Sequence, residues 1–542
     1  MKRNEILEEL NRHICGLSFT NVISFLALSE VHYYNESTFI HPKDWLSYDE
    51  WMFVIGLWLK NANKAPSNNI ETFEDVEAIA NEIKDLLKQL HSSYISEASS
   101  LYSFEQESID ELQRFVMNST TLVQEAIFYA GAGAIDLQYT SFITDKYKSD
   151  RDWIKQNKGV DINKFQSFYI TLKHILNSKM KEFTTDMIRS QYNTNYGIDF
   201  PYIVDIEEII YSDNDYRSII ELLSFDLANP SVIKINGLED FNPLVEFPLI
   251  KLDDSHLFVP NCSIVANSLY ELPFFWIIKD KDYYDKYGYN NRGTAAEILT
   301  KQLLERVFPS EKILKNVEIV QNKNNCAEID VLVIYENTAI IFQVKSKRLT
   351  LNSRKGNKES IVEDFRQAIG KAYEQAKESE TKIKESNSIF ICNNKKLDMP
   401  NIHSTIKIGI TLDYFPAVES IIRRELDSSA FFTSMSIFDL DMLTRYLTAE
   451  QFVDYMSFRV NNRKPVFCSS EAGYLGFYLK HNGFDIIEQA LENSNQQSYN
   501  YNMVVIGEDY AQEIDKRLIP DLNREYMPDL LGGSKSDYHN LS

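Results

Sequence analysis

The chain has 542 residues, of which 44% are hydrophobic and 13% aromatic, so it is long enough for about three or four globular domains. Its formal net charge of −23 argues against a surface that is basic throughout for passive nucleic-acid binding, although a local basic groove is compatible with it. The sequence has no apolar run long enough to span a membrane, no apolar leader segment and no cluster of its five cysteines. We therefore expect a cytoplasmic protein with no membrane span and no zinc site.

Residues 1–225 are predicted to be mainly helical. Apolar residues recur at helical spacing in segments such as 76–94 and 165–183, and we interpret the aromatic side chains of these helices as core. Residues 226–287 are predicted to form a small β-containing linking region, in which VEFPLIKLDDSHLFVPN (245–261) reads as a hairpin around Asp253-Asp254. The Tyr-rich and Asn-rich segment 280–293 is expected to link this region to the next domain.

A further helix is predicted to begin at Gly293-Thr294-Ala295-Ala296-Glu297 and to continue to Phe308. Its apolar stripe consists of Ala296, Leu299, Leu303 and Val307. Glu297 lies at the margin of that stripe, from where it can point toward a sheet packed beneath. Thr294-x-x-Glu297 also fits a capping box, in which Glu297 completes the helix N-terminus and needs no catalytic role. The sequence leaves both roles open.

Two β-rich apolar runs, IDVLVIY (329–335) and AIIFQV (339–344), are predicted to pair as a hairpin. We expect Asn337-Thr338 to form a two-residue turn, because Asn tolerates a left-handed backbone. That register would place Asp330 opposite Lys345, with Gln343 on the same face of the sheet. A turn one residue longer would move Asp330 to the other face.

Asp330, Gln343 and Lys345 have the chemistry of a metal and water site. Phosphodiester hydrolysis needs a cation beside the scissile phosphate and an activated water. Asp330 offers a hard oxygen to Mg²⁺ or Mn²⁺, and Gln343 offers an amide oxygen that can bind the metal or fix its water. Lys345 can stabilise developing negative charge or orient the attacking water.

Simpler roles for the same residues are also open. Asp330 could be a solvated strand residue, and Lys345 and Lys347 could protect an edge strand from aggregation. Glu328 shares a strand face with Asp330 and could compete with it for the metal. Each residue alone is weak support for a site, so the argument depends on the whole set and on its order along the chain.

That order is a helix with Glu297, then a strand with Asp330, then a strand with Gln343-x-Lys345. It resembles the PD-(D/E)xK nuclease superfamily, in its variant with Gln at the first position of the third motif. The resemblance covers 288–415 and implies a restriction-endonuclease-like domain. It also implies that Glu297 and Asp330 bind metal and that Lys345 is catalytic, and we add Gln343 to the predicted metal ligands.

The segment KSKRLTLNSRKGNK (345–358) holds six basic residues and no acid, and it starts at the predicted catalytic lysine. It could hold the phosphate backbone of a nucleic acid or be a solvated loop. A helix is expected to follow from Ser360, with a second capping box through Glu363. The predicted nucleic-acid contacts are Lys347, Arg348, Arg354, Lys355, Lys358 and, on the polar stripe of that helix, Gln375. A solvated helix face is the alternative for Gln375.

Further strands are predicted at 386–393 and 406–413, and residues 416–542 read as a helical C-terminal region. The predicted fold class is therefore α/β, a restriction-endonuclease-like mixed-sheet core (288–415) with large, mainly α-helical flanking domains. The predicted function is a metal-dependent endonuclease that uses Mg²⁺ or Mn²⁺, with DNA favoured over RNA and a role in antiviral or genome defence. A catalytically inactive nuclease-fold scaffold and an RNA-cleaving effector are the alternatives. A homo-oligomer or an activating protein partner is left open, and no membrane partner is expected.

Overall fold

The computed structural model describes residues 2–35, 46–65, 70, 72–100, 120–129, 131, 133–190, 196–227, 233–355, 357–385, 387–416, 426, 431–462, 466–495 and 504–528. The chain divides into two compact units. Unit 1 comprises Met1–Asp285 and Asn523–Ser542, and unit 2 comprises Lys286–Leu522. The four predicted regions, with boundaries at 225, 287 and 415, are finer than this division and stay a prediction.

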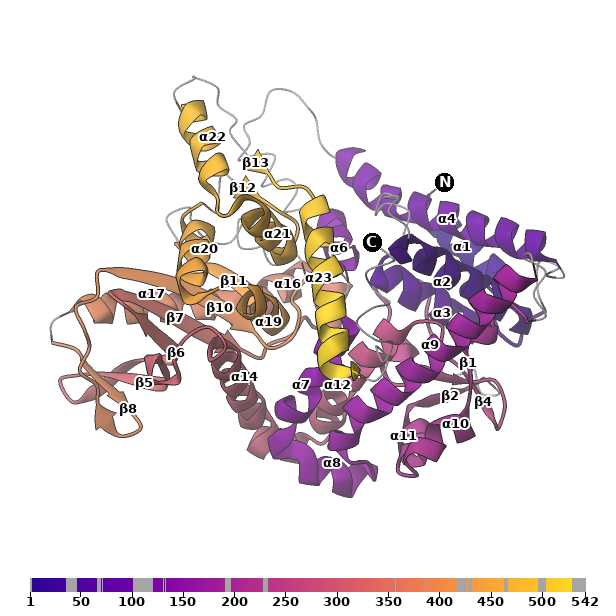
Figure 1. Cartoon of the computed structure of the whole chain (residues 1–542), viewed down its shortest axis with the longest axis horizontal. Coiled ribbons are helices and arrows are strands. Elements are labelled where there is room, and N and C mark those ends of the chain that lie inside the picture. The colour runs from indigo at the N-terminus through magenta and orange to yellow at the C-terminus, as the bar shows by residue number, and fades with distance from the viewer. Residues whose placement is uncertain are drawn as a thin grey trace. The chain divides into compact units, whose positions relative to one another are not determined.

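Unit 1 is mainly helical (Figure 1). Its helices are α1 (Arg3–His13), α2 (Thr20–Asn35), α3 (Tyr48–Asn61), α4 (Phe73–Ser100), α6 (Thr120–Phe128), α7 (Asp136–Lys146), α8 (Arg151–Lys158), α9 (Phe165–Arg189), α10 (Ile206–Ser212), α11 (Tyr216–Leu223), α12 (Cys262–Lys279) and α13 (Lys281–Tyr283). Aromatic residues of these helices, including Trp58 and Tyr169, are fully buried, as expected for core positions.

A small sheet completes unit 1. Its strands are β1 (Ile203–Asp205), β2 (Ser224–Asp226), β3 (Leu249–Lys251) and β4 (His256–Phe258), in the order β1-β4-β3-β2. β3 and β4 are antiparallel, with Ile250 opposite Phe258, which confirms the predicted hairpin. Helix α12 was not predicted in this linking region. It is apolar on nearly every side, so its sequence lacks the polar face that marks a helix at the surface.

Unit 2 is built on a seven-stranded mixed sheet (Figure 1). Its strands are β5 (Ile313–Gln321), β6 (Asn324–Tyr335), β7 (Thr338–Lys345), β8 (Ile389–Cys392), β9 (Lys395–Lys396), β10 (Ser404–Thr411) and β11 (Thr433–Ser436), in the order β11-β10-β7-β6-β5-β8-β9. β10 is parallel to both β7 and β11, and the other neighbouring pairs are antiparallel. The predicted α/β class with a mixed sheet and helical flanks is confirmed. The sequence did not predict β5 or β11, and β11 extends the sheet beyond residue 415.

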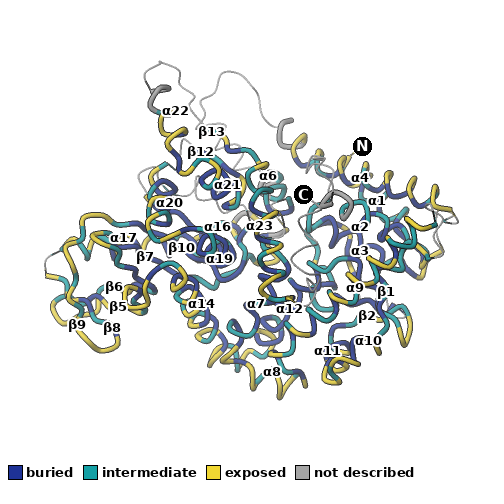
Figure 2. The backbone as a smooth tube through the Cα atoms, in the orientation of Figure 1, coloured by how far each residue is buried: buried dark blue, intermediate teal, exposed yellow. Residues whose placement is uncertain are grey.

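The helices after Lys286 are α14 (Tyr289–Leu304), α15 (Leu351–Arg354), α16 (Lys358–Phe365), α17 (Lys371–Lys384), α19 (Ile437–Tyr446), α20 (Ala449–Asn461), α21 (Glu471–His481), α22 (Asp485–Asn495) and α23 (Asp509–Tyr526). Two further short strands, β12 (Val466–Phe467) and β13 (Val504–Val505), pair with each other. Helix α14 packs against β5, β6 and β7, whereas α17 packs against β6, β7 and β10. The central strands β7 and β10 are almost entirely buried (Figure 2).

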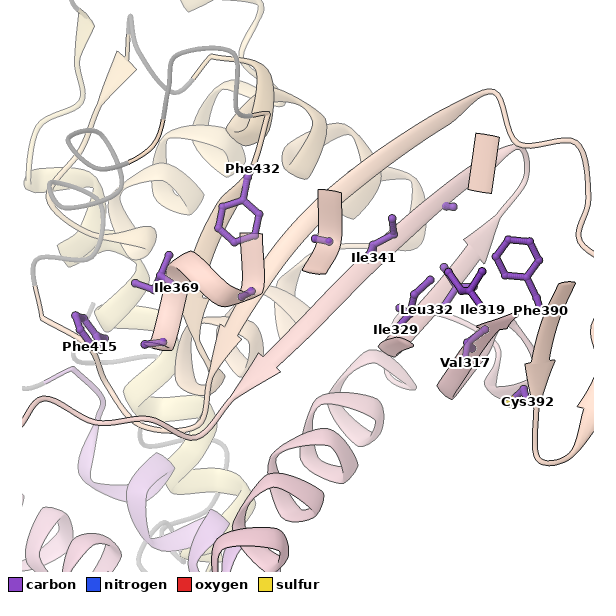
Figure 3. Close-up of a cluster of buried hydrophobic side chains, with 14 of the residues drawn as sticks. Val317, Ile319, Ile329, Leu332, Ile341, Ile369, Phe390, Cys392, Phe415 and Phe432 are labelled. Atoms are coloured by element: carbon purple, nitrogen blue, oxygen red, sulfur yellow. The ribbon is translucent and has the colours of Figure 1, made fainter. Parts of the chain in front are cut away.

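One hydrophobic cluster joins the sheet to the segment that contains α16 and α17. Leu332 of β6 and Ile341 of β7 are paired across the sheet and pack in this cluster with Ile369, which lies in a π-helical turn between the two helices (Figure 3). Phe432, just before β11, belongs to the same cluster. The cluster fixes the helical segment over the β6–β7 hairpin.

Among the described residues, every helix is too short or too polar to cross a membrane.

Two predicted helix starts are wrong. Helix α14 begins at Tyr289 and follows α13 and a π-helical turn at Tyr284–Gly288, so the segment predicted as a link is helical. Thr294 and Glu297 therefore lie inside a helix, and Glu297 is not a capping residue. Helix α16 begins at Lys358 because Asn357 is its N-cap, and the Asn357 side chain accepts a hydrogen bond from the Ser360 N–H.

Candidate active site

Asp330 and Lys345 meet where β6 and β7 lie side by side. Lys345 Nζ lies 3.3 Å from Asp330 Oδ2, and both side chains are largely buried. The same carboxylate oxygen accepts a hydrogen bond of 2.7 Å from the backbone N–H of Val344. Because a backbone donor holds Asp330 in place, its carboxylate has a defined direction beside the end of β7.

The hairpin register differs from the predicted one. The turn is Glu336-Asn337, since Tyr335 pairs with Thr338, and Glu336 has a left-handed backbone with φ +50°. β7 is therefore shifted by two residues, and Asp330 is not directly opposite Lys345. A shift of two keeps every side chain on the face it would otherwise have, because side chains alternate with a period of two. The predicted pairing is wrong, yet the two side chains still meet.

Gln343 is fully buried, and its two amide atoms have different surroundings. Nε2 donates a hydrogen bond of 2.8 Å to the backbone carbonyl of Glu328. Oε1 is buried and has no hydrogen-bond partner among the residues that the structure describes. Leaving a buried acceptor unsatisfied costs about 1–3 kcal/mol, so an oxygen in this state is a natural acceptor for a ligand atom.

Glu297 projects from α14 and forms an ion pair with a lysine that the sequence did not single out. Its Oε2 lies 3.3 Å from Nζ of Lys315, in β5. Burial, followed by the negative charge of Asp330, raises the pKa of Glu297, and Glu328 adds to this effect. Burial and Asp330 likewise raise the pKa of Glu328. The three carboxylates thus act on one another, and we call them the acidic cluster (Glu297, Glu328, Asp330).

The donors of the site fit Mg²⁺ or Mn²⁺ by chemical type. Carboxylate oxygens and an unsatisfied amide oxygen are the hard ligands that these ions prefer. However, within the described ranges no group of three or more His, Cys, Asp or Glu side chains is arranged to hold a metal ion. In the structure Asp330 and Glu297 are instead each paired with a lysine, Lys345 and Lys315 respectively.

Residues 292–407 match a family model described as NERD, nuclease-related domain. The matched segment includes Glu297, Asp330, Gln343 and Lys345 and ends within β10. It is consistent with a nuclease of the restriction-endonuclease-like type, which supports the coarser part of the predicted resemblance. The match does not test the Gln-x-Lys variant. No curated protein and no solved structure matches the chain.

The nuclease-related segment differs in charge from the rest of the chain. Residues 292–407 contain twenty Lys and Arg residues and fifteen Asp and Glu residues, whereas the whole chain contains 56 and 79. The segment therefore carries a net charge of +5, and the remainder carries −28. Positive charge on the segment that holds the candidate site is the sign that a polyanionic substrate requires.

The predicted phosphate contacts Lys347 and Arg348 lie near buried carboxylates. Lys347 Nζ is 2.8 Å from Asp364 Oδ1, and Arg348 Nε is 3.9 Å from Asp413 Oδ2. Asp364 also accepts hydrogen bonds from the Thr350 N–H at 2.7 Å and from the Ser353 hydroxyl at 2.5 Å. The first part of the basic segment is therefore folded around Asp364, and its residues 351–354 form the short helix α15.

Of the remaining predicted contacts, Lys355 and Gln375 are exposed. The side chains of Arg354 and Lys358 lie outside the described part of the structure. A role of these residues in nucleic-acid binding stays a prediction.

Sequence reasoning missed Asp413 and Asp364 as organisers of this region. Asp413 is buried two residues after the end of β10 and pairs with Arg292 of α14, which is also buried. The available sequence signal for Asp413 was an acid directly after the apolar run IKIGITL (406–412). Its partner is 121 residues away in the sequence, and the spacing of residues does not reveal such a pair.

Proposed function

We propose that this protein is a metal-dependent endonuclease that hydrolyses phosphodiester bonds. The observation that carries the proposal is the contact of the Asp330 carboxylate with the Lys345 ammonium inside a segment that matches a nuclease-related domain. The unsatisfied Oε1 of Gln343 and the neighbouring Glu297 support it, because they add oxygen donors at the same place.

Each residue has a distinct proposed role. Glu297, Asp330 and Gln343 would hold Mg²⁺ or Mn²⁺, which when bound supplies Lewis acidity and an activated water. The Val344 N–H keeps Asp330 oriented. Lys345 stabilises the negative charge that develops on the phosphate, or orients the attacking water, once it leaves Asp330.

DNA is the proposed substrate, because the resemblance to the PD-(D/E)xK superfamily implies enzymes that mostly cut DNA. The net positive charge of 292–407 supports a polyanionic substrate but does not distinguish DNA from RNA. We extend the proposal to a role in antiviral or genome defence, which a phage plating assay with wild type and Asp330→Ala would test. Equal plating with both proteins contradicts that role.

The decisive experiment compares four substrates under three conditions. Supercoiled plasmid, linear duplex DNA, single-stranded DNA and RNA are each incubated with the full chain in Mg²⁺, Mn²⁺ or EDTA. We expect cleavage of a DNA substrate with either metal and none in EDTA, and no cleavage by Asp330→Ala. The absence of wild-type cleavage under every condition overturns the proposal.

An inactive nuclease-fold scaffold is the second candidate. It is favoured by the lysine pairs on both Asp330 and Glu297, and by the absence of a three-residue metal-holding group within the described ranges. This candidate predicts nucleic-acid binding that neither needs metal nor leads to cleavage. A filter-binding assay in EDTA, run beside the cleavage assay, separates it from the proposed enzyme.

A further inference from the structure

We propose that Lys315 is an internal counter-ion of the site, which holds Glu297 in the absence of metal and which a divalent cation must displace. The inference rests on the proposed function, since it concerns the affinity of the same site for metal. It assigns a role to a residue that lies outside the predicted motif.

The geometry places Lys315 as a counterpart of Lys345. Its Nζ lies 3.3 Å from Glu297 Oε2, the same separation as that between Lys345 Nζ and Asp330 Oδ2. Lys315 is paired with Val331, the residue after Asp330, across β5 and β6, and the charges of Lys315 and Asp330 both act on Glu297 and on Glu328. Each carboxylate that is proposed to bind metal thus has an ammonium group at one of its oxygens.

Lys315 is held more firmly than an ordinary surface lysine. Its side chain is 27% exposed, and that of Glu297 is 22% exposed. Its carbonyl accepts a hydrogen bond of 3.3 Å from the thiol of Cys392, in β8. The next residue, Asn316, has a left-handed backbone with φ +52°, and the β5–β6 register continues across it. The backbone around Lys315 is therefore specialised where the side chain reaches the acidic cluster.

The charges explain why Lys315 would oppose metal binding. The acidic cluster has three carboxylates, and Lys315 and Lys345 act on it with two positive charges. Without Lys315, Glu297 would face the negative charges of Asp330 and Glu328 alone. A divalent cation bound by Glu297 and Asp330 would lie beside both ammonium groups, and like charges at this separation repel. Lys315 therefore stabilises the metal-free site and lowers its affinity for metal.

The test measures metal binding directly, with no nucleic acid present. Isothermal titration of the full chain with Mn²⁺ or Mg²⁺ is carried out for wild type, Lys315→Met, Lys315→Gln and Lys315→Arg. We expect Kd to fall about three- to tenfold in the Met and Gln variants, and to remain near the wild-type value in the Arg variant, which keeps the charge.

Lys312→Met is the matched control. Lys312 is an exposed lysine three residues before Lys315, so this variant removes the same charge from the same part of the chain. We expect it to bind metal like the wild type. If Lys312→Met lowers Kd as much as Lys315→Met does, the effect is one of overall charge, and the inference is overturned.

The outcomes separate the inference from the proposed function. Metal binding by the wild type with an unchanged Kd in Lys315→Met and Lys315→Gln overturns the inference and leaves the proposed function intact. If neither the wild type nor any variant binds metal or cleaves, the proposed function fails, and the inference fails with it. If Lys315→Met does not fold, an unchanged Kd in Lys315→Gln overturns the inference and a lower one supports it.

Discussion

Arg292 of α14 donates to the buried carboxylate of Asp413, which follows β10, so the helix that carries Glu297 is tied to the strand beside β7. The side chains are 8% and 4% exposed. Removal of one partner of a buried ion pair leaves the other charge desolvated, at a cost of about 3–5 kcal/mol. We predict that Asp413→Asn lowers the stability of unit 2 by an amount in this range.

The control for that prediction removes both charges. The double variant Arg292→Met with Asp413→Leu removes both charges of this pair and leaves Arg348, which is 23% exposed, nearby, so the double variant should be more stable than Asp413→Asn. Thermal melts of the wild type and both variants provide the measurement. An Asp413→Asn variant as stable as the wild type would show that the pair contributes little.

Asp330→Ala and Lys345→Ala are each expected to lower the cleavage rate at least about a hundredfold, because each removes a group proposed to act on the metal or the phosphate. Each change breaks the Asp330–Lys345 pair, so thermal melts of both variants are recorded beside the rates, and cleavage is compared at a temperature at which both stay folded. Lys347→Ala is a poor control because Lys347 pairs with buried Asp364, whereas Lys312→Ala removes one exposed charge outside the proposed site and the basic segment. Full activity of either site variant contradicts the assignment.

The site could be predicted because its main elements are local. Asp330, Gln343 and Lys345 lie on two adjacent strands whose apolar runs are plain in the sequence, and the hairpin brings them together in either of two registers that differ by two residues. The exact register could not be predicted. It depends on a left-handed Glu336, and residue preferences favour Asn at such a position.

The partners of the site could not be predicted because they come from tertiary packing. Lys315 lies in β5, whose sequence ILKNVEIVQ has the polar pair Lys315-Asn316 among its apolar residues and so lacks a regular strand alternation. Asn316 also has a left-handed backbone. The lysine reaches Glu297 only because α14 packs on this strand. The capping box at Thr294 was predicted from a real local pattern, but the helix begins one turn earlier, and this removes the alternative role of Glu297.

Because Glu297 is not a helix cap, Glu297→Gln should report on the site and not on the start of the helix. The change removes a carboxylate charge from the proposed Mg²⁺ site, so the Mg²⁺ concentration for half-maximal cleavage should rise and the maximal rate should fall. Glu305→Gln, at the C-terminal end of the same helix, is the matched control and should behave like the wild type. The measurement is cleavage rate against Mg²⁺ concentration. Superimposed curves for Glu297→Gln and wild type would remove Glu297 from the site.

The basic segment is expected to bind phosphates and not bases. Replacement of Arg354, Lys355 and Lys358 by Gln should weaken nucleic-acid binding similarly for all sequences. The slope of log affinity against log salt should decrease by about 0.9 for each duplex phosphate contact that is lost. Lys347→Gln should instead lower stability, because it leaves Asp364 buried without its ammonium partner. An unchanged slope in the triple variant would show that these side chains are only solvated.

The stability of unit 2 should fall in acid in part through Glu380 of α17. Lys407, in β10, lies 2.5 Å from its carboxylate, and Thr405 donates a second bond of 2.5 Å. These contacts outweigh the effect of burial and lower the pKa of Glu380 to about 2. A carboxyl group whose pKa is lower in the folded state contributes stability above its unfolded pKa of about 4.3, and this contribution is lost as pH falls toward 2.

At pH 6, Glu380→Gln should therefore be less stable than the wild type by about 1–3 kcal/mol, because it leaves Lys407 buried without its charge partner. Melting temperatures at pH 6 and pH 3 provide the test. The gap between wild type and variant should narrow at pH 3, and a gap that is constant with pH would show that the charge of Glu380 is not what stabilises this contact.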